Sequence, residues 1–283
     1  MLRNRNRREA YVGVSGLVSP EQQEALISDD IEQRLANTGR RLAMGVKAAH
    51  KPQIDDAENK HGRNWYPVSD AISTALDPNI RSTFNIVQAQ LKPELVETNH
   101  TYPRMFFDTI RSRTASVLDA IQINQLRYER QPERYTHVIR AMSSLGLQTI
   151  IQCHSHAMKA GPDEALKALQ TLTEKLEVDY ILFDASHGRG KELNPDVSKR
   201  FLEVAYNNSH FSDNGTNFGI AGGLSEETVE PLLSNLLQDF PDISWDAEGR
   251  LHDKIKHGGT GSLNLDRAKS YLEQSVDIAE RYC

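Results

Sequence analysis

Two aspartates in the C-terminal third of the sequence are the side chains most suited to acid–base chemistry. Asp184 ends the apolar run that begins at Tyr180, and Asp246 follows a second apolar run that begins at Ile243. Apolar neighbours desolvate a carboxyl group, which raises its pKa and keeps it available as a proton donor. Asp246 is then the natural second carboxylate, and it could instead bind an amine or a hydroxyl of a substrate. In the structural alternative, a strand-end aspartate caps nearby backbone N–H groups.

Two glycine-containing turns are suited to binding phosphate. Gly222 and Gly223 follow an apolar run and precede residues 224–226, which open a helix. Bare backbone N–H groups could approach phosphate oxygens there, close to a helix N-terminus. Gly249 lies in a second turn after the next apolar run, and the two turns would converge on one anion if the strands are neighbours in a barrel. The alternative for each turn is a tight bend that needs glycine dihedrals.

The segment Gly188-Arg-Gly-Lys191 follows Asp184 and carries two cationic side chains, Arg189 and Lys191. We interpret this segment as a flexible lid that closes over a bound anion, excludes water and adds positive charge. An ordinary solvated basic loop would have the same composition.

Histidines near the predicted rim raise the question of a metal site. His154 and His156 end one apolar run, and His187 lies on the loop after another. A His-x-His pair supplies two ligands, but no third-ligand motif or carboxylate pair lies near it in the sequence. We therefore predict no metal site and no cofactor, and a hydrogen-bonded or acid–base role for His154. Cys153 alternates with its strand neighbours, so we expect it to face the helix layer as a packing residue.

Eight short apolar runs alternate with helical patterns, which predicts one α/β domain over residues 1–283, a (β/α)8 TIM barrel. An open doubly wound sheet usually has fewer strands and an early Gly-x-Gly-x-x-Gly loop. Here the glycine-rich turns follow strands six, seven and eight, where barrels bind phosphate. The predicted strands are 11–16, 42–46, 84–89, 118–124, 149–154, 180–184, 218–221 and 243–245.

The segments between these strands contain helix signals and two enlarged loops. Ser19-Pro20 predicts a helix start, and Gly39 a plausible stop. Pro231 lies too deep for an uninterrupted helix and predicts a kink or a restart. Residues 50–66 and 92–102 are predicted to be insertions after strands two and three, on the rim where barrel enzymes bind ligands.

Composition excludes several classes of protein. The chain has 33 basic and 39 acidic residues, so no global field attracts nucleic acid or an anionic membrane surface. No run approaches the length of a spanning helix, and the arginine-rich residues 1–10 are interpreted as a flexible terminus. The two cysteines, Cys153 and Cys283, favour a reducing, cytoplasmic location. The expected partner is a small phosphorylated molecule, and the oligomeric state is left open.

These motifs resemble those of phosphoribosylanthranilate isomerase, a TIM-barrel enzyme of tryptophan biosynthesis. The resemblance extends from the first strand to the last. Ile220-Ala-Gly-Gly-Leu224 resembles the family's Leu-Ala-Gly-Gly-Leu turn, and Asp184 with Gly188-Arg-Gly-Lys191 resembles its strand-six aspartate and Gly-x-Gly-Lys lid. Asp246-Ala-Glu-Gly249 resembles the family's strand-eight aspartate and phosphate turn. Ile121-Gln-Ile-Asn124 resembles its strand-four Val-Gln-Leu-His, and Gly13-Val-Ser-Gly-Leu-Val18 its opening Lys-Ile-Cys-Gly-Leu-Thr.

The resemblance implies an Amadori rearrangement of an N-linked 5-phosphoribosyl amine, in which an acid opens the ribose ring and a base moves the C2 proton. By resemblance Asp184 is the acid and Gln122 binds the substrate. The family's base is the cysteine of the opening motif, and this chain has Ser15 there. A hydroxyl without an activating partner is a far weaker base than a thiolate. Asn124 also replaces the strand-four histidine, so the resemblance implies altered chemistry or substrate, with His154 as another candidate base.

The resemblance therefore implies an isomerase of the aldose–ketose type, acting on a phosphoribosyl conjugate or a related phosphosugar. One alternative is a lyase or hydrolase of a phosphosugar, in which Asp246 or a histidine transfers the proton. A further alternative, supported by Ser15, is a barrel that binds a phosphosugar without turnover. Product analysis separates the two enzymes, because isomerisation conserves mass.

Overall fold

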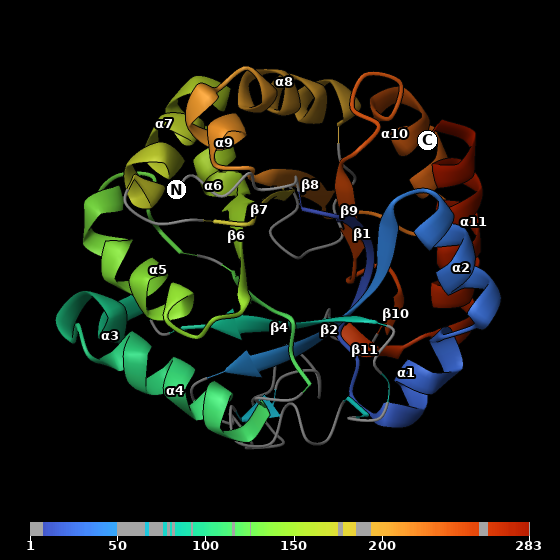
Figure 1. Ribbon diagram of the computed structural model, residues 1–283, viewed down its shortest axis with the longest axis horizontal. Coiled ribbons are helices and arrows are strands. Elements are labelled where there is room, and N and C mark those ends of the chain that lie inside the picture. Colours follow the sequence, from blue (N-terminus) through green and yellow to red (C-terminus); the bar gives the residue numbers. More distant parts are fainter. Residues whose placement is uncertain are drawn as a thin grey trace, which may run out of the picture.

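The computed structural model contains a closed barrel of eight parallel strands inside a ring of helices (Figure 1). It describes residues 8–49, 66–67, 76–77, 80, 83–91, 93–114, 117–124, 126–174, 178–184, 194–254 and 260–282. In chain order the barrel strands are β1 (Ala10–Ser15), β2 (Arg40–Ala49), β4 (Phe84–Gln90), β5 (Ala120–Ile123), β6 (Gln148–His154), β7 (Tyr180–Asp184), β8 (Asn217–Ala221) and β9 (Ser244–Ala247).

Closure of the barrel depends on β1, which pairs in parallel with strands from both ends of the chain. It pairs with β2 from Ala10 opposite Arg40 onward, and with β9 from Val12 opposite Trp245 onward. The other strands follow one another in chain order from β2 to β9, so the sheet forms a ring. Each of the eight predicted strands overlaps one of these strands, and the predicted (β/α)8 TIM barrel is confirmed.

Helices cover the outside of the barrel (Figure 1). Their apolar side chains pack on outward-facing strand residues, among them Val12, Cys153 and Trp245. Within the described part of the chain, no helix is both long and apolar enough to cross a membrane. The helices are α1 (Pro20–Leu26), α2 (Asp29–Asn37), α3 (Pro93–Thr98), α4 (Tyr102–Thr114), α5 (Thr136–Ser143), α6 (Ser155–Met158), α7 (Pro162–Thr173), α8 (Pro195–Tyr206), α9 (Ser209–Asp213), α10 (Val229–Leu236) and α11 (Leu265–Tyr282), with a 3₁₀ helix at Pro132–Tyr135.

Two helix boundaries differ from the predicted ones. Ser19 caps α1 as predicted, but the Ser28 hydroxyl accepts a hydrogen bond from the N–H of Ile31 and begins a second helix. One helix was predicted there, and the structure has two. After β8 the helix begins at Val229, beyond a turn over 225–228. The predicted helix start at residues 224–226 was therefore wrong, and Pro231 lies in the first turn of α10, where proline needs no kink.

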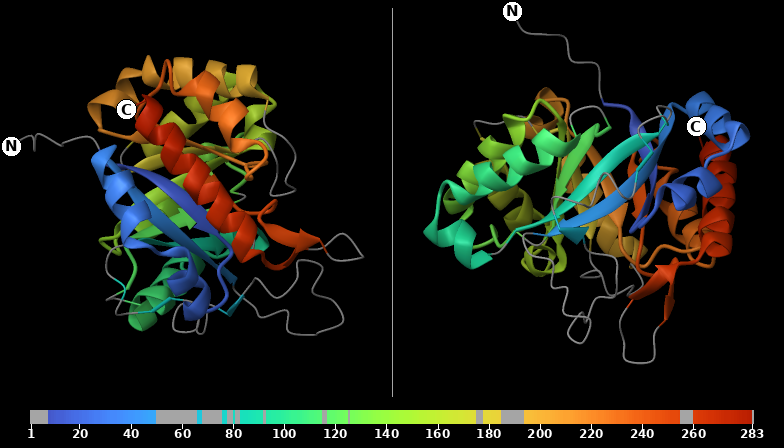
Figure 2. Two further views of the ribbon diagram at one scale, coloured as in Figure 1. Left: turned by 90° about the vertical axis from the view of Figure 1, so that its right-hand side faces the viewer. Right: turned by 90° about the horizontal axis from the view of Figure 1, so that it is seen from below.

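The segments beyond the strand ends are only partly described. The predicted insertion 92–102 contains α3 and the first residue of α4. The insertion 50–66 lies outside the described residues except for Tyr66, which with Pro67 forms β3 beside β2. After β9 the chain forms an antiparallel hairpin, β10 (His252–Lys254) and β11 (Thr260–Leu263), that was not predicted. Figure 2 shows this hairpin projecting from the barrel beside α11.

An apolar plug fills the barrel interior toward the amino ends of the strands. The aromatic rings of Tyr11, Phe84 and Tyr180 pack against one another there, with centroids 5.4 to 6.0 Å apart. Because side chains alternate along a strand, inward and outward residues form separate clusters. The buried inward cluster consists of Tyr11, Ala43, Phe84, Ile86, Ala120, Ile150, Tyr180 and Leu182, with Ala221 at the carboxyl end of β8.

Polar contacts close the amino end of the barrel below this plug. The carboxylate of Asp179 accepts a hydrogen bond from the Thr149 N–H at 2.8 Å and pairs with the Arg8 guanidinium at 2.6 Å. The Asn217 amide donates to the Arg8 carbonyl at 2.9 Å. The flexible terminus was predicted to include residues 8–10, but these residues are held by the barrel, and Ala10 begins β1.

Removing the Asp179 carboxylate should destabilise the barrel. Asp179→Ala leaves the Thr149 N–H without its acceptor and breaks the ion pair with Arg8. A lost partner of a part-buried donor costs about 1–3 kcal/mol, which urea denaturation would measure. Asp239→Ala is the matched control, because Asp239 forms an exposed ion pair with Lys199. Equal effects of the two changes would contradict the assigned role of Asp179.

Candidate active site

A layer of polar side chains lies above the apolar plug, at the carboxyl ends of the barrel strands. Each of its residues continues the inward-facing alternation of its strand. All are buried, with exposed fractions between 1% and 8%. We call this set the mouth layer: Ser15 on β1, Lys47 on β2, Gln88 on β4, Gln122 on β5, Gln152 on β6, Asp184 on β7 and Asp246 on β9.

Ser15 and Asp246 form the central contact of the mouth layer. The Ser15 hydroxyl lies 3.0 Å from each carboxylate oxygen of Asp246 and donates to that group. The Gln88 amide N–H group donates to the Ser15 oxygen at 2.8 Å and to Asp246 at 3.2 Å. The structure therefore gives Ser15 a carboxylate partner, which the sequence alone did not indicate.

Two glycines provide the space for this contact. A Cβ atom on Gly13 would lie 2.6 Å from an Asp246 carboxylate oxygen, and one on Gly45 would lie 2.3 Å from the Ser15 oxygen. Both distances are far below van der Waals contact, so a larger residue at either position would displace the pair. The absence of side chains on β1 and β2 at these positions is what places the hydroxyl and carboxylate inside the ring.

Burial raises the pKa of Asp246 from its ordinary value near 3.8 to about 7. The nearby carboxylate of Glu248 contributes to this rise, and the hydrogen bond from Ser15 opposes it. Asp184 adds a smaller repulsion, and the Lys47 ammonium a smaller attraction. A carboxyl group with a pKa near 7 can both accept and donate a proton at neutral pH.

Lys47 and Glu248 form a second charged contact beside Asp246. The Lys47 ammonium pairs with the carboxylate of Glu248, which lies in the turn after β9. Sequence reasoning missed both residues, although Lys47 occupies an inward position two residues after Gly45 in a strand pattern. The same turn is held by His252, whose ring nitrogens contact the carbonyl oxygens of Glu248 at 2.9 Å and Gly16 at 3.3 Å.

Asp184 lies on the same layer as Asp246, with one strand between them. The Gln152 amide N–H group donates to the Asp184 carboxylate at 2.6 Å. Ala221 on β8 is the register partner of both aspartates. Because neighbouring strands are about 4.8 Å apart, the two backbones are separated by roughly 10 Å. Both candidate carboxyl groups thus lie at the mouth, with the small side chain of Ala221 between them. The sequence analysis did not identify Gln152.

His154 is engaged by the segment after β5 and by the chain directly after β6 rather than by the mouth layer. Its Nε2 lies 2.8 Å from the Leu126 carbonyl oxygen, and its Nδ1 accepts from the His156 N–H at 3.2 Å. Burial lowers the pKa of His154, so the neutral ring is favoured. Over the described ranges, no three His, Cys, Asp or Glu residues are placed to hold a metal ion. His187 lies outside those ranges.

Cys153 packs in the outer layer, as the strand alternation predicted. Burial raises the pKa of its thiol to about 12. The thiol is therefore un-ionised at neutral pH and unsuited to nucleophilic chemistry.

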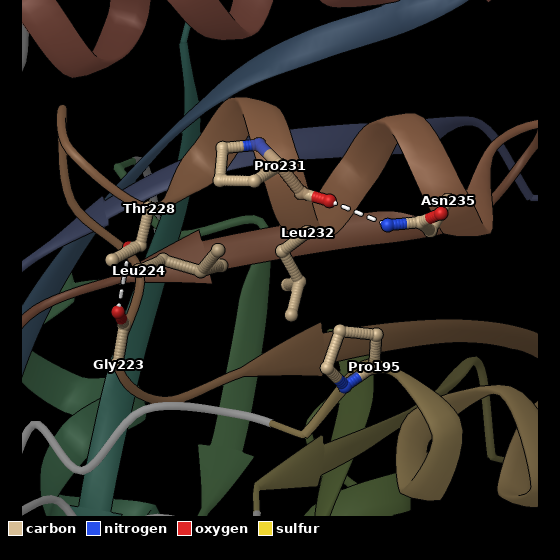
Figure 3. A pocket seen from close by; sticks show the side chains of 7 residues that line it. All are labelled: Pro195, Gly223, Leu224, Thr228, Pro231, Leu232 and Asn235. Atoms are coloured by element: carbon tan, nitrogen blue, oxygen red, sulfur yellow. Dashed lines mark hydrogen bonds between the residues drawn. The ribbon is translucent and has the colours of Figure 1, made fainter.

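The turn after β8 has the backbone conformation that requires glycine. Gly222 and Gly223 have φ angles of 93° and 71°, in the left-handed region. The Thr228 hydroxyl donates to the Gly223 carbonyl at 2.8 Å. A pocket of about 180 Å³ lies beside Gly223, between the start of α8 at Pro195 and the side of α10 at Leu232 (Figure 3). No residue of the mouth layer lines this pocket.

Gly249 lies in the turn after β9, which leads into β10 rather than into a helix. Arg267 on α11 links this turn to the one after β8. Its guanidinium donates to the Arg250 carbonyl at 3.2 Å and pairs with Glu226 at 3.4 Å. The two predicted phosphate turns are therefore neighbours. Arg189 and Lys191, the predicted lid cations, lie outside the described residues.

Comparison with known proteins identifies the fold. No protein-family model and no curated protein sequence matches the chain. N-(5'-phosphoribosyl)anthranilate isomerase from Pyrococcus furiosus has a similar structure, with a TM-score of 0.51, 13% identity and coverage of 96% of this chain and 99% of that one. The N-terminal domain of a candidate aldolase from Bacteroides vulgatus has a TM-score of 0.53 and 14% identity, with coverage of 96% and 84%. At these identities the likeness shows the TIM-barrel fold alone.

The raised pKa of Asp246 should make stability depend on pH. Because the folded protein binds this proton more tightly than the unfolded chain, the contribution is fully present below about pH 4 and is lost as pH rises to about 7. We expect Asp246→Asn to gain stability relative to the unsubstituted protein across this window, by on the order of 4 kcal/mol at most. Urea denaturation at several pH values tests this, with Asp196→Asn on the exposed start of α8 as control. A stability difference that is independent of pH would refute the assignment.

The space at Gly45 gives a second prediction. Gly45→Ala should cost about 1–3 kcal/mol of unfolding free energy, because the new methyl group overlaps the Ser15 hydroxyl. Adding Gly45→Ala to Ser15→Ala should cost less, because the overlapping oxygen is gone. A double-mutant cycle by denaturation measures the coupling. Equal costs in both backgrounds would show that the hydroxyl does not occupy this space.

Proposed function

We propose that the protein is an enzyme, an isomerase of the aldose–ketose type that acts on a phosphoribosyl conjugate or a related phosphosugar. The observation that carries this proposal is the buried Asp246 carboxyl, with a pKa near 7, bonded to Ser15 and Gln88 on the same layer as Asp184. Two carboxyl groups at the open end of a barrel supply the acid and the base that such a reaction needs.

In this proposal Asp184 is the acid and Asp246 is the base. Asp184 donates a proton to the ring oxygen of the sugar as the C1–O bond breaks, and a lone pair of the C1 substituent forms a C1=N bond in a glycosylamine, or a C1=O bond as the C1 hydroxyl loses its proton. The Asp246 carboxylate then removes the proton from C2, so that the C2–H electron pair forms the C1=C2 bond and the C1=N or C1=O π pair moves to the nitrogen or oxygen. A proton returns to C1 as the C2 hydroxyl loses its own, so the ketose product has the mass of the substrate.

Asp246 is a better base than the two alternatives that the sequence suggested. The Ser15 hydroxyl donates a hydrogen bond to Asp246, which suits a residue that orients the carboxylate. Both ring nitrogens of His154 are engaged by main-chain groups, the Leu126 carbonyl after β5 and the His156 N–H after β6. Asp246 combines a pKa near the working pH with fixed orientation, which are the properties expected of a general base.

The phosphate is assigned to the turns after β8 and β9. Gly222 and Gly223 carry no side chains and have left-handed conformations, and backbone N–H groups in turns of this kind can bind an anion. Arg267 holds the Gly249 turn beside them, and Arg189 and Lys191 remain the sequence-based candidates for added positive charge. The fold is similar to that of an isomerase whose name specifies a phosphoribosyl group, which is consistent with this substrate class.

Substitution of either carboxyl group tests the proposal. The protein is incubated in D₂O with a panel of aldose phosphates and N-(5-phosphoribosyl)arylamines, and products are analysed by NMR and mass spectrometry. We expect conversion at constant mass apart from deuterium incorporation, and a fall in kcat of roughly 100- to 10,000-fold for Asp184→Asn and Asp246→Asn. Asp196→Asn is the control, because that carboxyl lies on the exposed start of α8.

Three outcomes would redirect the proposal. Cleaved products would favour a phosphosugar lyase or hydrolase, and tight binding without turnover would favour a binding protein. Full activity of Asp246→Asn would reject the assigned base. The rate of the unsubstituted enzyme should also rise with pH through about 7, because Asp246 must lose its proton to act as a base.

A further inference from the structure

Two buried glutamine side chains in the mouth layer have unused acceptors. Gln88 and Gln122 are each 1% exposed. Among the described residues, none donates a hydrogen bond to the side-chain carbonyl oxygen of either glutamine. These two acceptors therefore face the barrel interior without a protein partner in that part of the chain.

The two carbonyl groups are neighbours and are held in place. Gln88 on β4 and Gln122 on β5 are register partners in adjacent parallel strands, about 4.8 Å apart. The amide N–H group of Gln88 is bound by Ser15 and Asp246, and that of Gln122 donates to the Asn124 side chain at 2.7 Å. Because the amide ends are fixed, the carbonyl ends have defined positions.

Simple packing does not account for this arrangement. A buried acceptor without a donor is unfavourable, and nearly all such groups in native proteins are satisfied. Apolar residues fill the inward positions immediately below, Ile86 on β4 and Ala120 on β5. At the mouth, the inward positions of β4 and β5 carry amide side chains, and two of their acceptors are unpaired within the described segments. This arrangement is suited to a ligand that brings hydrogen-bond donors.

We infer that Gln88 and Gln122 form an acceptor pair that binds hydroxyl groups on two neighbouring carbons of the substrate. This inference rests on the proposed function and specifies its substrate class as a sugar phosphate with a free vicinal diol. Neutral carbonyl oxygens suit neutral hydroxyl donors, while the nearby carboxylates would serve the reacting atoms. We assign the 2-hydroxyl to Gln122 and the neighbouring hydroxyl to Gln88, whose amide group also donates to Asp246.

The test compares binding of ribose 5-phosphate with that of 2-deoxyribose 5-phosphate by calorimetry. These probes share the phosphate and differ in one hydroxyl of the diol. We expect the unsubstituted protein to bind ribose 5-phosphate about tenfold more tightly, because the deoxy sugar leaves one buried acceptor unpaired. Gln122→Met should reduce the ratio to about one by weakening ribose 5-phosphate alone.

Gln122 is the better position for the substitution, because it makes no contact with Asp246 in the described structure. Gln122→Asn is a second variant in case Gln122→Met fails to fold. Gln148→Met is the matched control. Gln148 begins β6 at the opposite end of the barrel, where its carbonyl accepts from Arg41. The tenfold preference should persist in this control.

The outcomes separate this inference from the proposed function. The acceptor pair would be overturned if the unsubstituted protein bound the two sugars equally or bound neither. It would also be overturned if the preference survived in both Gln122 variants. These conclusions hold whatever the turnover assays show. A hydroxyl preference that depends on Gln122 in a protein without turnover would support the acceptor pair and reject the isomerase.

Discussion

The hydrogen bond between Ser15 and Asp246 is the contact on which the barrel mouth depends. Its residues are 231 positions apart in the chain, and pairing of β1 with β9 brings them together. Gly13 and Gly45 leave the volume that the pair occupies. The same burial that encloses the contact raises the pKa of Asp246 to about 7. Ring closure and the capacity for proton transfer therefore have a common physical origin.

The interior of the barrel is divided along its axis into an apolar part and a polar part. Aromatic and aliphatic side chains fill the amino end and stabilise the fold by burial. The mouth layer instead buries carboxyls, amides and the ammonium of Lys47, which are groups that lose free energy when removed from water. Stability is lower as a result, and acidic and amide groups become available to a ligand. Such a local loss of stability is typical of functional sites.

The sequence predicted those features that arise from local patterns. Eight apolar runs predicted the barrel, because a strand ended by a turn is visible within a few residues. Asp184 and Asp246 were visible for the same reason. The contacts of Ser15 could not be predicted, because they join strands distant in sequence. Gln88 lay inside a strand that looked uniformly buried, and Lys47 lay one residue beyond the predicted end of its strand at 46. The break between α1 and α2 was missed because the capping signal of Ser28 is one residue long.

The hairpin residue His252 spans the seam of the barrel, where it contacts the turns that follow β1 and β9. During translation β1 leaves the ribosome long before β9, and its outer edge stays unpaired until the last barrel strand arrives. A nascent chain therefore cannot assemble Ser15, Asp246 and Glu248 early, however well its first helices have formed. Release of β9 and the hairpin completes the ring in a single late event, so incomplete translation products lack the assembled mouth.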